Sequence, residues 1–382
     1  MNIQQLISSE GKTSRQKASH PILLMSRIRL ARNIEGFSFP GWSDSEKKLQ
    51  IYELCRGAIE QVEEFSPCIH FSIESLDKNE RQYLVERHLI SKELCEGEIG
   101  AGVTIDDTRS MSIMINEEDH LRIQVMSPGL SFDSIWNRSD AIDNALEKQL
   151  NYSFRENLGY LTACPTNLGT GMRASVMLHL PGLVLTKQME KVVRAVNQLG
   201  IVARGIFGES SDPSGSVFQI SNQQTLGESE SEIIHRLENV IRTIIVQEAN
   251  ARIRLFEQDE DRVVDRICRA FGVLRYANML SSSEAMNLLS MLRFASDIQI
   301  MPANVRSMVD DLIMNTQPSH LQFDYGGILD SNQRDLLRAQ KIREKLSSIV
   351  EPNPSDLDFT LLKSASILPK NETGGATSGE PS

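Results

Sequence analysis

The stretch "MSIMINEEDHLRIQVM", Met111–Met126, indicates how the first half of the chain folds. Apolar and polar residues alternate in "MSIMI" and again in "LRIQVM", and only a short polar segment separates the two runs. Alternation with a period of two is typical of β-strands buried on one face, and so short a connection predicts an antiparallel hairpin. The tip of this hairpin crowds three carboxylates together beside an arginine, namely Glu117, Glu118, Asp119 and Arg122.

Short alternating runs and helical stretches mix from residue 21 to residue 227, and the pattern then changes. Beyond that point, segments such as "ESESEIIHRLENVIRTIIVQEANARIRLFE" carry apolar residues at helical spacing, so residues 228–350 are predicted to form an all-helical domain. Residues 1–20 are polar and predicted to be flexible. Residues 351–382 are predicted to be largely disordered, because the final segment "PKNETGGATSGEPS" cannot bury enough apolar surface to offset its ordering entropy.

The composition restricts the class of protein. The chain has 382 residues, 40% of them apolar and 24% charged, as in an ordinary soluble globular protein. The net charge of −11 argues against broad binding to nucleic acid or to membrane surfaces. The apolar run "PILLM" is too short for a signal peptide or a membrane span. The five cysteines show neither CxxC nor zinc-ligand spacing, which predicts no protein metal site and suits a reducing cytoplasm.

Arginine recurs at positions next to turns in the first domain. A single arginine is most often a solvated surface charge, but planar guanidinium groups match phosphate oxygens, and a cluster of them can hold a triphosphate. The sequence contains no GxxxxGK[ST] loop and no kinase HRD or DFG motif, so nucleotide binding would depend on such a cluster. The candidates are Arg27, Arg29, Arg122, Arg173 and Arg204.

Four motifs carry a family resemblance. They are "SRIRLARN" from Ser26, "NEEDHLR" from Asn116, "CPTNLGTGMRASV" from Cys164 and "RGIFGE" from Arg204. On these motifs the chain resembles the phosphagen kinases (the ATP:guanido phosphotransferase superfamily), and most closely the bacterial protein-arginine kinases. The match covers about residues 21–230. It implies an α+β fold in which residues 21–227 form a catalytic domain with a mainly antiparallel central sheet flanked by helices.

The resemblance also implies site residues. ATP would be the phosphoryl donor, with Mg²⁺ held mainly by the nucleotide phosphates. Glu118 and Glu209 would hold the guanidinium group of the substrate as catalytic residues, and Cys164 would lie beside it. This chain departs from the family at Met25, where a Ser or Thr is usual, so any hydroxyl contact from that side chain is lost. The implied nucleotide-binding residues are Ser26, Arg27, Ile28, Arg29, Leu30, His88, Arg122, Arg173, Ala174, Ser175, Val176, Met177, Arg204, Gly205, Ile206, Phe207, Gly208 and Glu209.

Guanidinium chemistry explains the acidic hairpin tip. An arginine side chain is protonated at neutral pH and is then a poor nucleophile, so phosphorylating it requires a carboxylate that orients it and accepts a proton. The family match selects Glu118 for this role, whereas spacing alone does not separate it from Glu117. Strand alternation predicts that these two side chains point to opposite faces. Cys164 is either a small buried hydrophobe or a thiol that helps to position the guanidinium group, and the "CPTN" context favours the second. His120 is expected to be a turn residue.

Two features favour protein arginine over a free amino acid as the substrate. The "SRIR" motif begins at Ser26, so the helical N-terminal domain of metabolic phosphagen kinases is expected to be absent and the site to be open to a polypeptide. "RDLLRA" matches the RDxxRA element with which protein-arginine kinases bind phosphoarginine. Helical spacing places its two arginines on one face, opposite an apolar stripe that includes Leu336. The pocket residues would be Arg334, Asp335, Arg338 and Ala339.

The sequence therefore predicts an ATP-dependent kinase of arginine side chains in proteins. The resemblance adds a role in stress response and protein quality control through a Clp-type ATPase and protease, a zinc-binding activator protein, allosteric regulation by phosphoarginine and a homodimer. The sequence leaves two alternatives open. One is a kinase of a free guanidino compound such as arginine, and the other is a phosphoarginine-binding adaptor with weak or no catalysis.

Overall fold

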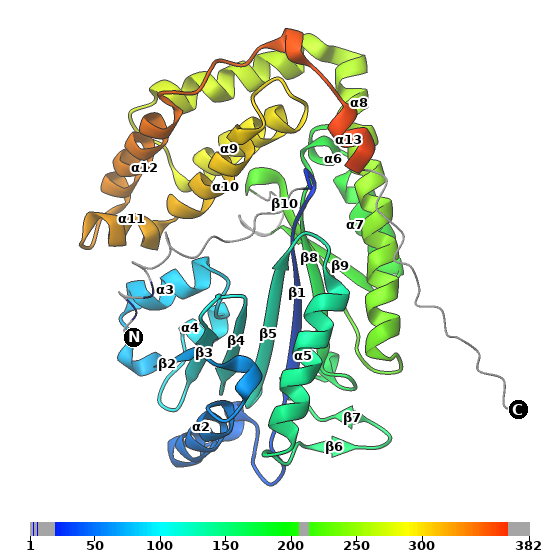
Figure 1. The fold of residues 1–382 in the computed structure, drawn as a ribbon, viewed down its shortest axis with the longest axis vertical. Coiled ribbons are helices and arrows are strands. Elements are labelled where there is room, and N and C mark those ends of the chain that lie inside the picture. Colours follow the sequence, from blue (N-terminus) through cyan, green and yellow to red (C-terminus); the bar gives the residue numbers. More distant parts are fainter. Residues whose placement is uncertain (1–2, 4–5, 7–19, 206–213, 366–382) are drawn as a thin grey trace, which may run out of the picture.

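A central eight-stranded sheet organises the first part of the molecule. The computed structural model describes residues 3, 6, 20–205 and 214–365. The strands are paired in the order β2-β3-β4-β5-β1-β8-β10-β9, and every pairing is antiparallel. Their bounds are β1 Leu23–Arg32, β2 Cys68–Ser72, β3 Gly102–Asp106, β4 Met111–Ile115, β5 Leu121–Pro128, β8 Met172–His179, β9 Ile201–Gly205 and β10 Val217–Asn222. The predicted α+β fold and the hairpin between β4 and β5 are confirmed (Figure 1).

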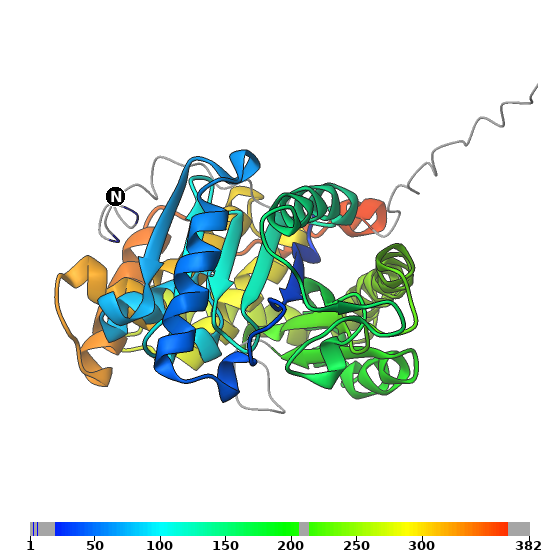
Figure 2. The same cartoon turned by 90° about the horizontal axis from the view of Figure 1, so that it is seen from below.

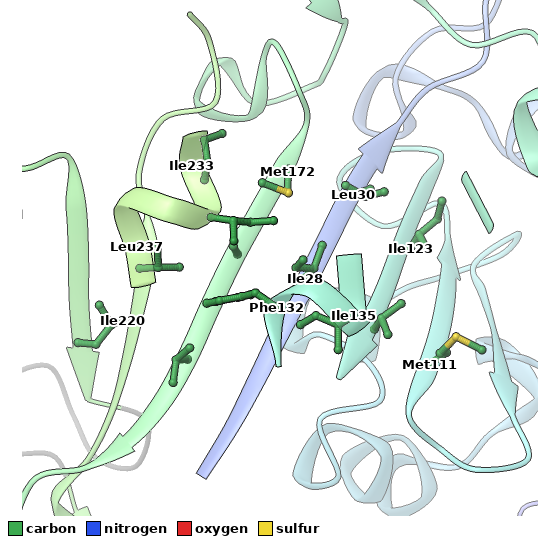
Figure 3. Packing of buried hydrophobic residues seen from close by; sticks show 14 of the residues in the cluster. Ile28, Leu30, Met111, Ile123, Phe132, Ile135, Met172, Ile220, Ile233 and Leu237 are labelled. Atoms are coloured by element: carbon green, nitrogen blue, oxygen red, sulfur yellow. The ribbon is translucent and has the colours of Figure 1, made fainter. Parts of the chain in front are cut away.

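Strand alternation sorts the side chains of this sheet onto two faces. Ile28 and Leu30 of β1 are fully buried in the largest apolar core, together with Ile123 of β5. Helices α5 (Phe132–Glu147) and α8 (Glu230–Tyr276) cover that face, and Figure 3 shows Phe132 and Ile135 of α5 close to Ile28. The residues between the apolar ones, such as Arg27 and Arg29, consequently point to the other face.

Shorter elements close the edges of the catalytic part. α3 and α4 pack with β2, β3 and the second face of β4 in a separate apolar cluster that includes Tyr83, Val103 and Met114. Helices α3 and α4 lie on the face of the sheet that carries Arg27 and Arg29. They therefore border that face and not the main core. The remaining bounds are α2 Ser45–Ile59, α3 Lys78–Glu86, α4 Lys92–Cys95, β6 Phe154–Arg155, β7 Gly159–Tyr160, α6 Pro181–Leu185 and α7 Met189–Gln198.

Helix α8 joins two hydrophobic cores. Ser229 caps its start by accepting a hydrogen bond from the backbone of Glu232. Its buried residues from Ile233 to Ala251 belong to the sheet core, whereas those from Phe256 onward belong to the core of the helical part. The backbone leaves the helical conformation at Asp259, with φ −161° and ψ 66°. The division between the cores thus lies within α8 and does not coincide with the predicted boundary after residue 227.

The helical part packs against one end of the sheet, as Figures 1 and 2 show. Its helices after α8 are α9 Ser282–Asp297, α10 Asn304–Asn315, α11 Pro318–Tyr325, α12 Ser331–Leu346 and α13 Thr360–Ala365. The segment 351–365 is ordered against this core, with Leu362 fully buried and Phe359 packed 5.5 Å from Phe256 between ring centroids. The prediction of a disordered tail is therefore wrong for 351–365, because its apolar side chains cover the helical core.

The predicted flexible N-terminus also needs a correction at two positions. Ile3 and Leu6 are 5% and 1% exposed and join the cluster around α3. Arg109 donates a 2.8 Å hydrogen bond to the carbonyl oxygen of Leu6. The polar composition of the segment concealed the burial of these two apolar side chains.

Candidate active site

One large cleft runs along the arginine-bearing face of the sheet and beneath the helical part. Its volume is about 1420 Å³, and residues of β1, β5, β8 and α3 line it together with residues that precede or belong to α9, α10 and α11. The predicted site residues that line it are Arg27, Arg29, His88, Glu118, Arg122, Cys164, Arg173, Arg204 and Gly205. The structure thus gathers onto one surface residues that are far apart in the sequence.

Strand register explains how the arginines converge. Arg29 of β1 lies directly opposite Arg173 of β8, and Ala31 lies opposite Arg122 of β5. Arg27 is two residues from Arg29 and therefore on the same face. Arg204 of β9 pairs with Gln219 of β10, which accepts a 2.7 Å hydrogen bond from Arg27. Gln219 was not among the predicted site residues, although the alternation of β10 places it on the same face as Arg204.

The arginines repel one another. Burial lowers the pKa of Arg27 to about 10, and the charges of Arg173 and Arg122 add to this shift. Burial and the same like charges, with that of Arg27, lower the pKa of Arg29 as well. The pKa of Arg173 is lowered by burial and by Arg204 and Arg122. A polyanion placed among these groups would relieve the repulsion, so the cluster favours a ligand with several negative charges.

Several buried donor atoms of this cluster have no partner in the part of the chain that the structure describes. The buried Nε atoms of Arg27, Arg29 and Arg173 have no hydrogen-bond partner among the described residues. In that part of the chain, no ion pair joins these three arginines to a carboxylate. Buried polar atoms are paired in most proteins, so unpaired buried donors on arginines that line a cleft indicate a binding site for an anion.

At the other end of this face, the structure distinguishes the two glutamates of the hairpin tip. The Glu117 side chain is fully buried, and its carboxylate accepts hydrogen bonds from Ser91 Oγ (2.6 Å), Arg122 Nη1 (2.6 Å) and the Glu118 backbone N–H (2.8 Å). The Glu118 side chain is 40% exposed and lies 3.2 Å from Arg122 Nη2. Its Oε2 also accepts a 3.4 Å hydrogen bond from Asn167. Glu118 alone of the pair keeps an oxygen available to the cleft.

The predicted orientation of these two glutamates is wrong. Both carboxylates reach the guanidinium of Arg122 instead of pointing to opposite faces. The reason is that they lie between β4 and β5, outside the regular strands, so the alternation of a strand does not apply to them. Burial raises the pKa of Glu118; Arg122 opposes this shift, and the carboxylates of Asp119 and Glu117 reinforce it.

Asp119 and His120 anchor the hairpin tip to its surroundings. Asp119 is fully buried, and its Oδ1 accepts hydrogen bonds from Asn33 Nδ2 (2.6 Å) and from the backbone N–H of Ala163 (2.7 Å). Ala163 immediately precedes Cys164, so this carboxylate ties the "CPTN" loop to the acidic tip. The His120 ring accepts from the Ile34 N–H (3.0 Å) and makes a 2.9 Å contact with a backbone carbonyl, which is a structural role.

Cys164 lies at the cleft beside the acidic tip. It is half-buried, and its Sγ is 3.0 Å from Thr166 Oγ1. Asn167, three residues later, is the donor to Glu118, so one loop supplies both the thiol and a contact to the carboxylate. Of the two interpretations, the buried hydrophobe does not fit, because Cys164 lines the cleft.

Five predicted nucleotide-binding residues do not face the cleft. Ile28, Leu30, Ala174 and Val176 are fully buried in the sheet core on the opposite face. Ser26 is also buried, and its hydroxyl donates to the carbonyl oxygen of Gly129 at 2.5 Å. Their side chains point away from the arginine face, because residues alternate in direction along a strand, so nucleotide binding at these five positions stays a prediction.

The remaining predicted positions fall into two groups. Ser175 and Met177 share the arginine face of β8 but are only 2% and 7% exposed. Ile206, Phe207, Gly208 and Glu209 lie outside the described residues, so the predicted approach of Glu209 to Glu118 is a proposal.

The predicted phosphoarginine pocket on α12 is more enclosed than expected. Arg334 donates to the Leu329 carbonyl oxygen (2.7 Å). Arg338 is 2% exposed and hydrogen-bonds to Asp335 at 2.5 Å and to two backbone carbonyl oxygens, while Ala339 is buried in the helical core. Binding of a phosphate by Arg338 would have to replace these contacts. The expected apolar stripe is also wrong at Leu336, which is 41% exposed.

Neither a cluster of metal ligands nor a membrane-spanning helix is found among the described residues. They contain no group of three or more His, Cys, Asp or Glu side chains placed to hold a metal ion. Within the same residues, none of the helices combines the length and the apolar character required to span a bilayer.

Two family models match the chain and divide it at the position where α8 passes between the cores. Residues 50–251 match the model described as "ATP:guanido phosphotransferase, C-terminal catalytic domain". Residues 260–357 match the model described as "Protein-arginine kinase McsB C-terminal domain".

Curated relatives match over most of their length. The chain is 42% identical over 331 residues to the protein-arginine kinase of Pelotomaculum thermopropionicum, covering 86% of this chain and 93% of that protein. It is 43% identical over 330 residues to the protein-arginine kinase of Symbiobacterium thermophilum, covering 86% and 94%. For the protein-arginine kinase of Bacillus cereus the identity is 42% over 327 residues, covering 85% and 92%.

Solved structures show the same fold. A lombricine kinase is similar with a TM-score of 0.53 and 25% identity, over 62% of this chain and 69% of that chain. The duplicated taurocyamine kinase from Schistosoma mansoni, with bound transition-state-analogue components, is similar with a TM-score of 0.55 and 23% identity. That match covers 64% of this chain but only 36% of the duplicated enzyme, and at this identity it supports the fold alone.

Proposed function

This chain belongs to the protein-arginine kinase family of ATP:guanido phosphotransferases, and on that premise we propose how its residues transfer the γ-phosphoryl group of ATP to arginine side chains of proteins. One observation carries the proposal. A cluster of mutually repelling arginines with unpaired donors shares a cleft with Glu118, a half-exposed carboxylate of raised pKa. The first feature fits a triphosphate and the second fits a guanidinium group.

The arginine face binds the phosphates. Arg27, Arg29 and Arg173 supply planar donor groups from neighbouring strands of a rigid sheet, so they need little rearrangement to meet the phosphate oxygens. Arg122, at the junction with the acidic tip, is where the γ-phosphoryl group would lie, because it is the arginine in direct contact with Glu118. Stabilisation of charge on the transferred group is the main catalytic requirement of phosphoryl transfer.

Glu118 orients the acceptor and takes its proton. A guanidinium nitrogen attacks the γ-phosphorus atom, the bond from that atom to the bridging oxygen of ADP breaks, and a proton passes from the attacking nitrogen to Glu118. The raised pKa of Glu118 makes it a better base than an ordinary glutamate. Cys164 and the "CPTN" loop would position the substrate guanidinium beside it, and Glu209 would hold it from the other side.

Mg²⁺ would enter with the nucleotide. The described residues offer no carboxylate cluster for it, so we propose that phosphate oxygens are its main ligands. It would neutralise part of the phosphate charge.

Further proposals rest on the family resemblance alone. They are a cytoplasmic location, a homodimer, a zinc-binding activator protein, delivery of marked proteins to a Clp-type ATPase and protease, and phosphoarginine binding by Arg334, Asp335, Arg338 and Ala339. The enclosed geometry of Arg338 makes the last of these conditional on a rearrangement of α12.

The test is phosphotransfer to a loosely folded protein, read as phosphoarginine by mass spectrometry at mild pH. We expect Glu118→Gln to reduce the product by about 10²- to 10⁴-fold, the usual contribution of a positioned base. Glu190→Gln, at a side chain that is 90% exposed, is the control and should leave the rate unchanged. Equal rates in the Glu118→Gln variant and the wild type would refute the assignment of the base. Faster turnover of free arginine than of protein arginine would favour the small-molecule kinase.

A further inference from the structure

Arg338 of α12 holds two turns of the helical part in place. Its Nη1 donates to the carbonyl oxygen of Leu280 (2.7 Å), and its Nε donates to that of Thr316 (3.0 Å). The first turn directly precedes α9, and Thr316 is the C-cap of α10, just before α11. The Leu280 N–H also donates to the backbone carbonyl of Asp335 (3.2 Å), so α12 fixes this peptide from both sides.

Each of these turns leads directly into the wall of the cleft. Ser282 and Ser283, which line the cleft, follow Leu280 by two and three residues. Gln317 and Pro318, which also line it, follow Thr316. One buried guanidinium therefore sets the position of two separate segments of the same wall, although Arg338 itself does not line the cleft.

The second turn is held from the catalytic part as well. The Glu86 carboxylate, at the end of α3, accepts hydrogen bonds from the backbone N–H of Ser319 (3.0 Å) and lies 2.8 Å from His320 Nδ1. Glu86 is two residues from His88, and both line the cleft. The start of α11 is thus fixed between Glu86 on one side and Arg338 on the other.

This wall faces the end of the cleft that is distant from the acidic tip. β1 enters the sheet beside the helical part, where Pro21 accepts a 2.6 Å hydrogen bond from Arg293 of α9. Arg122 and the acidic tip lie near the opposite end of β1, opposite Ala31. A triphosphate with its γ-phosphoryl group beside Glu118 would direct its nucleoside towards the helical wall.

We propose that Arg338 is a positioning residue for the nucleotide, which it serves by holding the Leu280 and Thr316 turns so that the α9 and α11 wall closes on the nucleoside end of ATP. This inference rests on the proposed function, namely that the cleft binds ATP. Loss of the hydrogen bonds from Arg338 to Leu280 and Thr316 would loosen the wall that contacts the nucleoside. The groups around the transferred phosphoryl would stay in place. Nucleotide affinity should therefore fall more than the rate of the chemical step.

The experiment compares the full-length wild type with Arg338→Ala and Arg338→Lys. We expect Arg338→Ala to raise both the KM for ATP and the Kd of a non-hydrolysable ATP analogue about tenfold, and to change kcat by less than about threefold. Arg338→Lys keeps the charge and one donor group, so it should show a smaller rise in the same direction. Amide hydrogen exchange should become faster in residues 280–286 and 313–320 of both variants.

Arg275→Ala is the matched control. Arg275 also donates to a backbone carbonyl, that of Ser347 (3.0 Å), which belongs to neither turn, so its loss should leave nucleotide affinity unchanged. An unchanged Kd in Arg338→Ala, or an equal rise in Arg275→Ala, would overturn the proposal. If Arg338→Ala does not fold, the Kd of Arg338→Lys is measured instead. A raised Kd in that variant supports the proposal, and an unchanged Kd overturns it. Because the Kd is measured by calorimetry without phosphotransfer, failure of the protein-arginine kinase activity would be seen separately.

Discussion

The molecule uses buried arginines in two contrasting ways. On the cleft face, Arg27 and Arg29 stand among like charges, and burial together with those charges lowers the pKa of each. At the junction of the two parts, Arg252 is fully buried between Glu248 (2.6 Å) and Asp297 (2.9 Å). Arg293 lies beside it, and although burial lowers its pKa, the nearby carboxylates outweigh this effect and raise it.

The difference separates a structural network from a binding site. Arg252 also donates to the carbonyl oxygen of His179 at the end of β8, and Glu248 accepts the N–H groups of Gly182 and Leu183 at the start of α6. Every charge there has an internal partner, so the network joins the two parts of the chain without any ligand. Arg27, Arg29 and Arg173 have no carboxylate partner of this kind among the described residues, so this part of the cleft suits an anionic ligand.

The strongest way to break this comparison is to remove one cleft arginine. Arg29→Met keeps an aliphatic side chain of similar length but deletes the charge. We expect kcat/KM for phosphotransfer to fall by about 10³-fold or more, as for other arginines that stabilise a transferred phosphoryl group. The thermal midpoint should stay constant or rise, because a repelling charge has gone. Arg155→Met, at an exposed side chain, is the control for both measurements. A lower midpoint with near-normal activity would show that Arg29 is structural.

The opposite result is expected at the junction. Arg252→Met should lower the free energy of unfolding by about 3–5 kcal/mol, because it leaves buried carboxylates without a partner. The KM of the folded fraction for ATP should not change, since neither Arg252 nor its partners Glu248 and Asp297 line the cleft or adjoin residues that do. Denaturant titration and steady-state kinetics measure the two quantities. Adding Glu248→Gln to Arg252→Met should recover part of the lost free energy of unfolding. A loss below about 1 kcal/mol in Arg252→Met alone would contradict the assignment of Arg252 to a structural network.

The smallest expected effect concerns pH and sharpens the role of the acidic tip. Burial, with Asp119, Glu117 and Glu93, raises the pKa of Glu118 against the effect of Arg122. Glu118 accepts a proton only as a carboxylate, so kcat/KM should fall as the pH drops through this raised pKa. Glu93→Gln removes one like charge and should move the acidic limb of the profile to lower pH. A shift to higher pH, or the same shift in Glu190→Gln, would contradict the assignment.

Much of the site was predictable because its determinants are local. The "NEEDHLR" tip and the arginines of "SRIR" were found in the sequence, and alternation alone assigns Ile28 and Leu30 to the core, opposite Arg27 and Arg29. The family motifs were nevertheless predicted to bind the nucleotide along their whole length. The predicted nucleotide site therefore included residues whose side chains lie in the core. The structural role of Asp119 was not predicted, since nothing in its local sequence indicates that it accepts a hydrogen bond from the Ala163 N–H.

The sequence by itself determined the period-two strands, the helical second part, the family and the residue types needed for guanidino-group phosphorylation, because periodicity and motifs depend on neighbouring residues. Only the tertiary structure decided which glutamate of the tip stays available, where α8 passes from one core to the other and how deeply Arg338 is buried. Each of these depends on contacts between residues that are distant in the chain. Packing against those distant partners sets burial and charge environment, which the order of residues along a single strand or helix does not contain.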